Sequence, residues 1–210
     1  MTAPVTRING FRPVKHLNGS PYNGQFNIYE IVAGDATAAF IGDLVKPDAG
    51  VGTVDAIMGT GGIYQTCIVH AAGQITAGNT TPTIGCIVGF VPDPTTLNSA
   101  NFRAASTKRY AMVADAPDLV FEVQDGGTVP CTSTLIGNNV GITAAVGSTT
   151  TGVSAFTTGT TAPTTTNTLP LKIVGIVNRP DNDTATAGAA FQKLLVTINQ
   201  HQYMGGTTAI

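Results

Sequence analysis

The fold is decided by residues 171–203, LKIVGIVNRPDNDTATAGAAFQKLLVTINQHQY. The first seven of these residues are apolar apart from Lys172, are rich in β-branched side chains and end at an Asn-Arg-Pro-Asp-Asn turn, which is the pattern of a buried strand. Further along, Leu194, Val196 and Ile198 point one way while their polar neighbours point the other, so a second strand has one face to bury. We expect the two strands to be antiparallel neighbours near the centre of a sheet.

A weaker form of the same pattern occurs earlier in the chain. Residues 87–93, IVGFVPD, repeat the apolar strand, the internal glycine and the Pro-Asp turn of residues 173–181, IVGIVNRPD. This similarity has two interpretations: an internal duplication, or the recurrence of a common strand-plus-turn unit.

Composition indicates strands and turns rather than helices. Ten of the twelve carboxylates are Asp, which favours turns, and the 210 residues include 25 Gly and 12 Pro. Glycines at the corners between short apolar runs predict an all-β fold, a barrel or sandwich of short antiparallel strands with an extended N-terminal arm. We expect a single β domain over residues 25–210, with an irregular insertion near 92–109 and a Thr/Gly-rich loop region over 143–168.

Residues 1–24 are predicted to form the extended arm, because they lack apolar periodicity and are punctuated by Asn-Gly turns. No carboxylate precedes Glu30, and the charge of the arm comes from Arg7, Arg12, Lys15 and His16. Such a segment gains order by lying on its own domain, on a neighbouring subunit or on a partner with an acidic surface, unless it frays into solvent. A second basic site, with no acid between Asp93 and Asp115, comprises Arg103, Lys108 and Arg109.

Charge is scarce and unevenly distributed. Charged residues make up 10% of the chain, against about 25% in an ordinary soluble domain. Residues 56–92 and 126–171 contain no Asp, Glu, Lys or Arg. These tracts predict either surfaces that lie against another protein or a polar Thr/Gly/Asn surface that needs no charge.

Whole-chain properties exclude two classes of partner. The net charge of −2 and the pI of about 5.8 argue against nucleic-acid binding. No apolar run has the length of a membrane span, and the first residues are not followed by a signal-peptide core. We therefore expect no membrane partner and synthesis in a cytoplasm.

No motif for catalysis, metal binding or cofactor binding is recognised. There is no Gly-x-Ser-x-Gly elbow, no Gly-rich run with phosphate-loop spacing, and no context of the three His that indicates a triad. Cys67 and His70 would lie on opposite faces of a strand, and residues 181–183 fit a turn better than a calcium loop. Glu30 and Glu122 could form a glycosidase pair, but carboxylates on separate strands are more often surface residues. We expect no enzyme activity, no catalytic residue, no metal and no cofactor.

The cysteines are expected to be free thiols. Cys67, Cys86 and Cys131 are odd in number and have no Cys-x-x-Cys spacing. Buried, unpaired side chains are the expected state.

Several short sequence motifs, in their order along the chain, resemble those of the capsid decoration or cement proteins of tailed bacteriophages. They are GFRPV (10–14) with PYNGQ (21–25), GDLVK (42–46), YAMV (110–113) through DLVFEVQ (118–124), and the tail from Lys172 through RPDN (179–182) to INQHQ (198–202). They cover about half of the chain, and residues 55–109 and 125–170 carry none of the resemblance.

The resemblance implies a β-rich structural protein of the virion, made in the host cytoplasm. It would dock on the outside of an assembled capsid as a homotrimer or other small oligomer and stabilise the shell, with the major capsid protein and itself as partners. A basic arm suits an acidic capsid surface, so the contact candidates are Arg7, Phe11, Arg12, Val14, Lys15, Arg103, Lys108 and Arg109. The alternatives are another virion component, such as a head-fibre base or tail protein, and a host-glycan-binding module.

Overall fold

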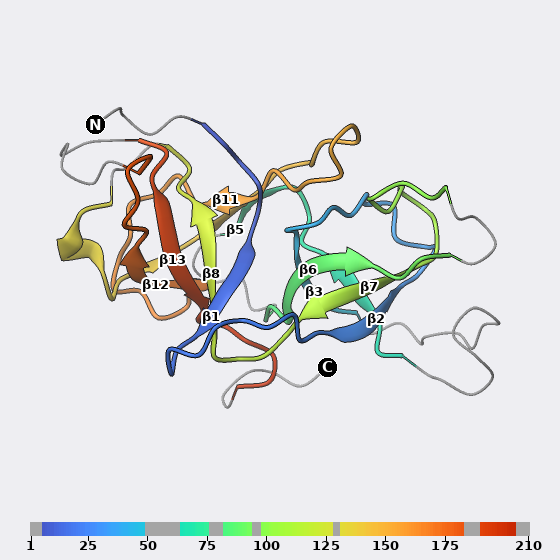
Figure 1. The fold of residues 1–210 in the computed structure, drawn as a ribbon, viewed down its shortest axis with the longest axis horizontal. Coiled ribbons are helices and arrows are strands. Elements are labelled where there is room, and N and C mark those ends of the chain that lie inside the picture. The colour runs from blue at the N-terminus through green and yellow to red at the C-terminus, as the bar shows by residue number, and fades with distance from the viewer. Residues whose placement is uncertain are drawn as a thin grey trace.

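The computed structural model describes residues 6–48, 64–75, 82–93, 98–127, 131–182 and 190–204. Over these residues the chain is all-β, as predicted, with short strands in antiparallel sheets that pack as a sandwich (Figure 1). A single turn of 3-10 helix, η1 (Ser133–Leu135), interrupts the strands of this part of the chain. No helix among the described residues is long and apolar enough to span a bilayer.

Two five-stranded sheets form the body of the fold. Sheet A has the order β1-β8-β13-β12-β9. Its strands are β1 (Arg12–His16), β8 (Leu119–Gln124), β13 (Lys193–Ile198), β12 (Leu171–Ile176) and β9 (Asn139–Val140). Sheet B has the order β2-β7-β6-β3-β4. Its strands are β2 (Asn27–Ile31), β7 (Arg109–Ala114), β6 (Gly85–Phe90), β3 (Leu44–Pro47) and β4 (Cys67–Val69).

A small third sheet lies behind sheet A in Figure 1. It has the order β11-β10-β5, with strands β11 (Thr157–Thr158), β10 (Ile142–Ala144) and β5 (Gly73–Ile75). Part of region 143–168, which was predicted to be a Thr/Gly-rich loop, is strand β11 instead. Both threonines of this strand are buried in the fold. The hydroxyl of Thr158 there accepts a hydrogen bond from the Gly126 N–H, so a polar side chain can be buried without losing its partner.

The strand pair predicted from residues 171–203 is confirmed. β12 and β13 pair antiparallel, and β13 occupies the centre of sheet A. Leu194, Val196 and Ile198 are all buried, as their alternation requires. The pairing shifts register between Ile173 and Gly175, which marks a β-bulge at Val174, next to the internal glycine.

One continuous cluster of buried side chains joins the two large sheets. It includes Ile87 and Val113 of sheet B and Phe121 and Val196 of sheet A. Phe11 belongs to it as well, with its ring 6.4 Å from that of Phe121 in an edge-to-face arrangement. The free thiols expected of the cysteines are confirmed, and all three are buried.

The segment predicted as an arm lies on its own domain, which is one of the three alternatives the sequence left open. Residues 12–16 are strand β1, which pairs with β8 at the edge of sheet A. Phe11 N–H donates to the Gly42 carbonyl at 2.9 Å, and the Phe11 carbonyl accepts from the Cys86 thiol at 2.9 Å. The described part of the segment is therefore integral to the sheet. Residues 1–5 of the predicted arm and 94–97 of the predicted insertion lie outside the described residues.

Sheets A and B share a topology. In chain order, β2, β3, β6 and β7 correspond to β8, β9, β12 and β13, and each set has the same spatial order, β2-β7-β6-β3 and β8-β13-β12-β9. The third strand of each set carries a bulge at the residue before its glycine. The pairing of β6 with β7 shifts between Ile87 and Gly89, just as that of β12 with β13 shifts between Ile173 and Gly175.

The hydrogen bonds around these strands also correspond. Gly42 N–H donates to the Ile87 carbonyl at 2.8 Å, and Gly137 N–H donates to the Ile173 carbonyl at 2.8 Å. The two glycines have left-handed φ values of 99° and 95°. Because strand order, bulge and turn agree together, we interpret the sequence similarity as an internal duplication rather than a chance recurrence.

Candidate functional site

The outer face of sheet A gathers cations from several strands. Arg12 of β1 lies opposite Glu122 of β8, and after a register shift Lys15 lies opposite Val120. Residues directly opposite each other in an antiparallel pair point to the same face. The bulge at Val14 therefore places Arg12 and Lys15 on one face, although three positions separate them in the sequence.

The next strands of the sheet add to this face. Lys193 of β13 lies opposite Gln124, and Lys172 of β12 lies opposite Thr197, which itself lies opposite Val120. These lysines therefore share the face of Arg12 and Lys15. We call this surface the basic face; its cations are Arg7, Arg12, Lys15, Lys172, Arg179 and Lys193.

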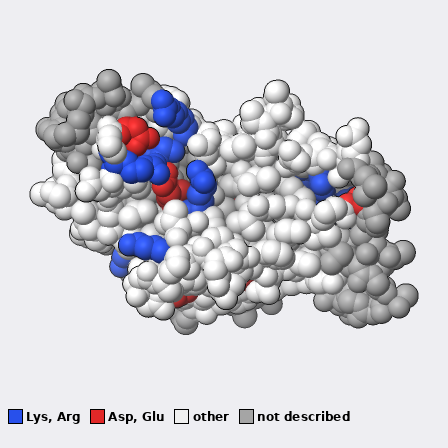
Figure 2. Space-filling model, viewed as in Figure 1, with Lys and Arg blue, Asp and Glu red and all other residues white. Residues whose placement is uncertain are grey.

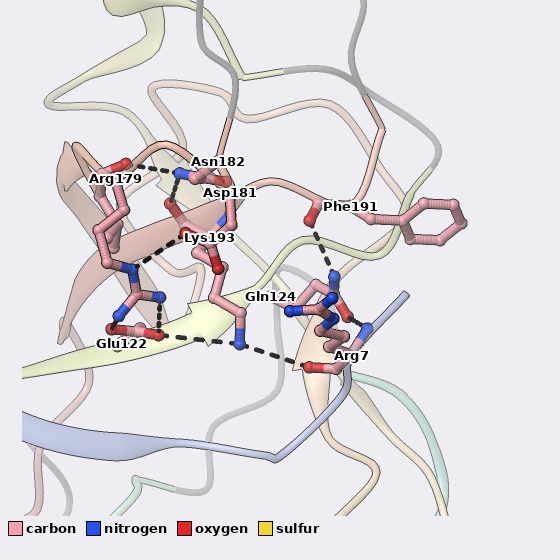
Figure 3. A network of polar contacts seen from close by, with 9 residues as sticks. Arg7, Glu122, Gln124, Arg179, Asp181, Asn182, Phe191 and Lys193 are labelled. Atoms are coloured by element: carbon pink, nitrogen blue, oxygen red, sulfur yellow. Dashed lines mark hydrogen bonds and ion pairs between the residues drawn. The ribbon is translucent and has the colours of Figure 1, made fainter. Parts of the chain in front are cut away.

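A carboxylate lies at the centre of the basic face. Arg179 binds Glu122 with both ends of its guanidinium, Nη2 to Oε1 at 2.8 Å and Nη1 to Oε2 at 3.2 Å. Lys193 Nζ lies 3.7 Å from Oε1, and Arg179 Nε lies 3.4 Å from an oxygen of Asp181. Figure 3 shows Arg179 and Lys193 approaching Glu122 from two sides. The hydrogen bonds that Arg179 donates to Glu122, more than any other contact, raise the pKa of Arg179.

The turn that carries Arg179 is held by Asn182. Its side-chain amide donates to the carbonyl oxygens of Val177 at 2.6 Å and Lys193 at 3.0 Å, and its oxygen accepts from the Lys193 N–H at 2.7 Å. This predicted turn therefore has its conformation fixed against β13. Asp183, the last residue of the stretch 181–183 that was compared with a calcium loop, lies outside the described residues.

The N-terminal segment is tied to the same face. The backbone N–H of Arg7 donates to Gln124 Oε1 at 2.9 Å, and Lys193 Nζ donates to the Arg7 carbonyl at 3.4 Å. Gln124 Nε2 in turn donates to the Phe191 carbonyl at 2.8 Å. The Arg7 side chain is exposed, so it extends the basic face beyond the edge of β8 (Figure 3).

The basic face opposes the overall charge of the chain. Six of the ten Lys and Arg lie on it, and the described carboxylates bonded to them are Glu122 and Asp181, whereas the chain as a whole carries −2. Figure 2 shows the charged side chains gathered over the lobe of β1, β8 and β13, while most of the rest of that view is uncharged. Salt screens exposed charges beyond about 8–10 Å, so a partner must approach this face closely to benefit from it.

Four of the predicted contact residues on the first segment are placed on or beside the basic face. Arg7, Arg12 and Lys15 are exposed, and Val14 is half-buried. Phe11 is a correction: its side chain is 1% exposed and packs in the core, so it has no surface to offer a partner. An apolar residue between basic ones can anchor the segment to its own sheet, and that is its role here.

The predicted second basic site requires another correction, because Arg103 is fully buried. Its guanidinium donates to four carbonyl oxygens and lies 3.5 Å from a carboxylate oxygen of Asp35. The four carbonyls belong to Val32, Asp35, Thr37 and Thr107. Burial lowers the pKa of Arg103, and Asp35 opposes that shift. This arginine stabilises loops of sheet B from within.

Lys108 and Arg109 also have partners inside the fold. Lys108 Nζ lies 3.4 Å from Glu30 Oε1 and 5.3 Å from the centre of the Tyr110 ring. Arg109 donates to the carbonyls of residues 100 and 102 at 2.6 and 2.7 Å, and stacks on the Phe90 ring at 4.9 Å. Arg109 belongs to β7 of sheet B and Lys108 directly precedes that strand, so neither joins the basic face of sheet A.

Sequence reasoning missed half of the basic face. Lys172 and Lys193 alternate with inward-pointing residues of β12 and β13, so strand periodicity could have placed them on an outer face. Nothing local shows that this face is also that of Arg12 and Lys15, since the pairing of β1 with β8 joins segments about a hundred residues apart.

The other candidates for a catalytic or metal-binding role have partners inside the fold instead. Glu30 and Glu122 were expected at the surface, but both are buried, on different sheets, each in an ion pair. The His70 ring lies 3.0 Å from the Thr83 hydroxyl, and burial lowers the pKa of His70 to about 3. Among the described residues, no group of three or more His, Cys, Asp or Glu is arranged to hold a metal ion.

Comparisons with protein-family models, with curated proteins and with solved structures found no match.

Proposed function

We propose that this chain is a non-enzymatic structural protein of a bacteriophage virion that binds the outer surface of the assembled capsid and stabilises it. Its partners would be the major capsid protein and further copies of itself, a homotrimer being the form that the sequence resemblance implies. The basic face of sheet A would be the surface that meets the capsid.

One observation carries this proposal: six of the ten Lys and Arg, five of them exposed, gather on one face of sheet A although the net charge of the chain is negative. Such asymmetry favours a partner with a complementary acidic surface, because complementary potentials speed association and fix orientation. The face is built on paired strands and on a turn held by Asn182, so its charges are presented by rigid elements.

Stabilisation would follow from mass action. A protein that binds the assembled lattice but not the free subunits lowers the free energy of the assembled state, by an amount that grows with the logarithm of its concentration relative to its dissociation constant. A lattice repeats each binding site many times, so a modest affinity per site accumulates over the shell.

The first experiment is electron cryomicroscopy of particles of the phage that encodes this chain. Density repeated over the outer lattice, with sheet A facing the shell, is the expected result. Density confined to one vertex or to the tail would instead favour a head-fibre base or tail component. Absence from particles would refute the virion assignment and leave the host-glycan-binding module as the remaining alternative.

The contact surface is tested by charge reversal. Arg12→Glu and Lys15→Glu change exposed side chains of β1, and each should weaken binding to particles lacking the protein by about tenfold, more at low salt. Lys46→Glu on β3 of sheet B is the control with the same change in charge. Equal binding by all three variants would exclude the basic face as the contact surface. Point substitutions are preferred to deletion of residues 1–20, because that deletion would remove β1 and the Phe11 core contact.

A further inference from the structure

A cavity of about 630 Å³ opens at the junction between the duplicated halves, where the chain passes from β7 to β8. Its walls come from the end of β1, the start of β2, the linker of residues 115–117 and Tyr203, which follows β13. The volume falls within the range of small-molecule sites, which is about 300–1,000 Å³. It has no part in the basic face, whose six cations are absent from its lining.

Aromatic rings form one component of the lining. Tyr22, Phe26 and Tyr203 all line the cavity. Phe26 is 44% exposed and Tyr203 46% exposed, which places both among the exposed large hydrophobic side chains of the described residues. Exposed aromatic rings beside a cavity offer flat apolar surfaces on which a ligand ring can stack.

A connected set of hydrogen bonds forms the second component. Asp115 accepts from Asn27 Nδ2 at 3.0 and 2.9 Å, one bond to each oxygen, and from the Tyr29 hydroxyl at 2.7 Å. The Tyr203 hydroxyl lies 2.8 Å from the Tyr29 hydroxyl and 2.8 Å from Gln65 Oε1. These side chains come from four separate segments and hold one another in place, so the polar groups are preorganised before any ligand arrives.

The polar groups are of the kind that binds hydroxyl groups. A carboxylate has about four lone-pair sites, and a side-chain amide carries two N–H donors beside its oxygen, so Asp115, Asn27 and Gln65 can accept from and donate to a ligand while keeping their mutual bonds. The cavity lining contains no Lys or Arg among the described residues, and its histidine, His16, is bonded to Asp118 at 3.0 Å. A phosphate or carboxylate ligand would find no fixed cation there.

We infer that this cavity is a binding site for one or two rings of a neutral saccharide. The apolar face of a sugar ring would stack on Phe26 or Tyr203, and its hydroxyl groups would bond to Asp115, Asn27 and Gln65. The inference does not rest on the proposed function, because it concerns other residues on another part of the surface. A protein held on a shell by sheet A could carry this site as well.

The test uses the full chain on an array of neutral hexose, deoxyhexose and N-acetylhexosamine glycans, with sialylated and sulfated glycans as a charged set. The strongest neutral hit is then titrated in solution and followed by tyrosine fluorescence. The chain has no Trp and five Tyr, of which Tyr22, Tyr29 and Tyr203 line the cavity, so the emission reports on this site. A dissociation constant of about 10 mM or tighter is expected.

Three variants locate the binding. Phe26→Ala removes a stacking surface and should weaken the neutral hit about tenfold, the value of one good aromatic contact. Tyr203→Phe keeps the ring but removes the hydroxyl that joins Tyr29 to Gln65. This variant should weaken binding of the neutral glycan to a similar degree. Ile136→Ala is the matched control, since Ile136 is also 44% exposed but does not line the cavity.

Each remaining outcome overturns the inference. These outcomes are no neutral glycan bound at about 10 mM, hits confined to the charged set, or a neutral hit whose affinity is the same in Phe26→Ala, Tyr203→Phe and Ile136→Ala. Circular dichroism of each variant confirms that the fold is retained. Binding of these variants to phage particles, measured in parallel, separates this site from the basic face.

Discussion

The carboxyl group of Asp43 should make the protein less stable as the pH rises toward neutral. Asp43 is 1% exposed, and its Oδ2 accepts a hydrogen bond from the Phe40 N–H at 2.8 Å. Burial raises the pKa of Asp43 from 3.8 to about 7, although the hydrogen bonds from Ser154 and from the Phe40 N–H act in the opposite direction. The folded protein therefore holds a proton that the unfolded chain releases.

The size and sign of the effect follow from linkage. Each pH unit between the folded and unfolded pKa is worth about 1.4 kcal/mol, so a difference of about three units costs about 4 kcal/mol once the carboxyl is ionised in both states. Between about pH 4 and about pH 7 the folded state binds more protons, so the free energy of unfolding falls across that range and the full cost is present above it.

Substitution of Asp43→Asn removes the ionisation and keeps an oxygen for the Phe40 N–H. The corresponding turn of the other half already carries an amide, Asn138, next to its glycine, so this side chain suits the backbone. The buried amide N–H groups need acceptors and can cost about 1–3 kcal/mol if they find none. We expect a net stabilisation of about 1–3 kcal/mol at pH 8, and a destabilisation of about 0.5–2.5 kcal/mol near pH 4, where the wild-type carboxyl is protonated and the cost of the amide remains.

The assay is urea unfolding followed by circular dichroism at several pH values from about 4 to about 8. Asp181→Asn is the control: its carboxylate is 51% exposed and pairs with Arg179 at 3.4 Å, so the change should stay within about 1 kcal/mol at every pH. If the difference between wild type and Asp43→Asn were the same at all pH values, burial of this carboxyl would not be the source of any pH dependence.

Further predictions concern a buried arginine, two turn glycines and the buried thiols. Arg103→Lys should destabilise the fold by about 2–4 kcal/mol in urea unfolding, because one ammonium cannot serve the four carbonyl oxygens that the guanidinium binds. Gly137→Ala should cost about 1 kcal/mol for its left-handed φ alone, and Gly42→Ala clearly more, since its Cβ would also lie 2.7 Å from the Asn9 carbonyl oxygen. A thiol reagent should label the protein only after urea is added, because burial raises the pKa of all three thiols; labelling of the folded protein would contradict this. These thiols are Cys67, Cys86 and Cys131.

The strands were predictable from the sequence because their determinants are local. The two-residue alternation of β13 and the apolar run of β12 indicate which side chains are buried, independently of which strands become their neighbours. The repeated glycine in residues 87–93 and 173–181 was also visible in the sequence. Its meaning became clear only from the matching bulges and the matching hydrogen bonds of Gly42 and Gly137.

The role of each basic residue was less predictable, because it depends on partners that are distant in sequence. Arg103 has no acid near it in the chain and was expected at the surface, yet Asp35 and the loop carbonyls bury it. Arg12 and Lys15 are exposed, as expected. Lys193, which shares the basic face with them, comes from the other end of the chain.

The sequence by itself determined that this chain is all-β, where its main strands lie and which of their faces are apolar, since the period of a strand is a local property of the backbone. Only the tertiary structure decided which strands became neighbours, because strand pairing depends on long-range packing and register. That pairing assembled the basic face from β1, β12 and β13. It also formed the open cavity between β2, the β7 to β8 linker and Tyr203.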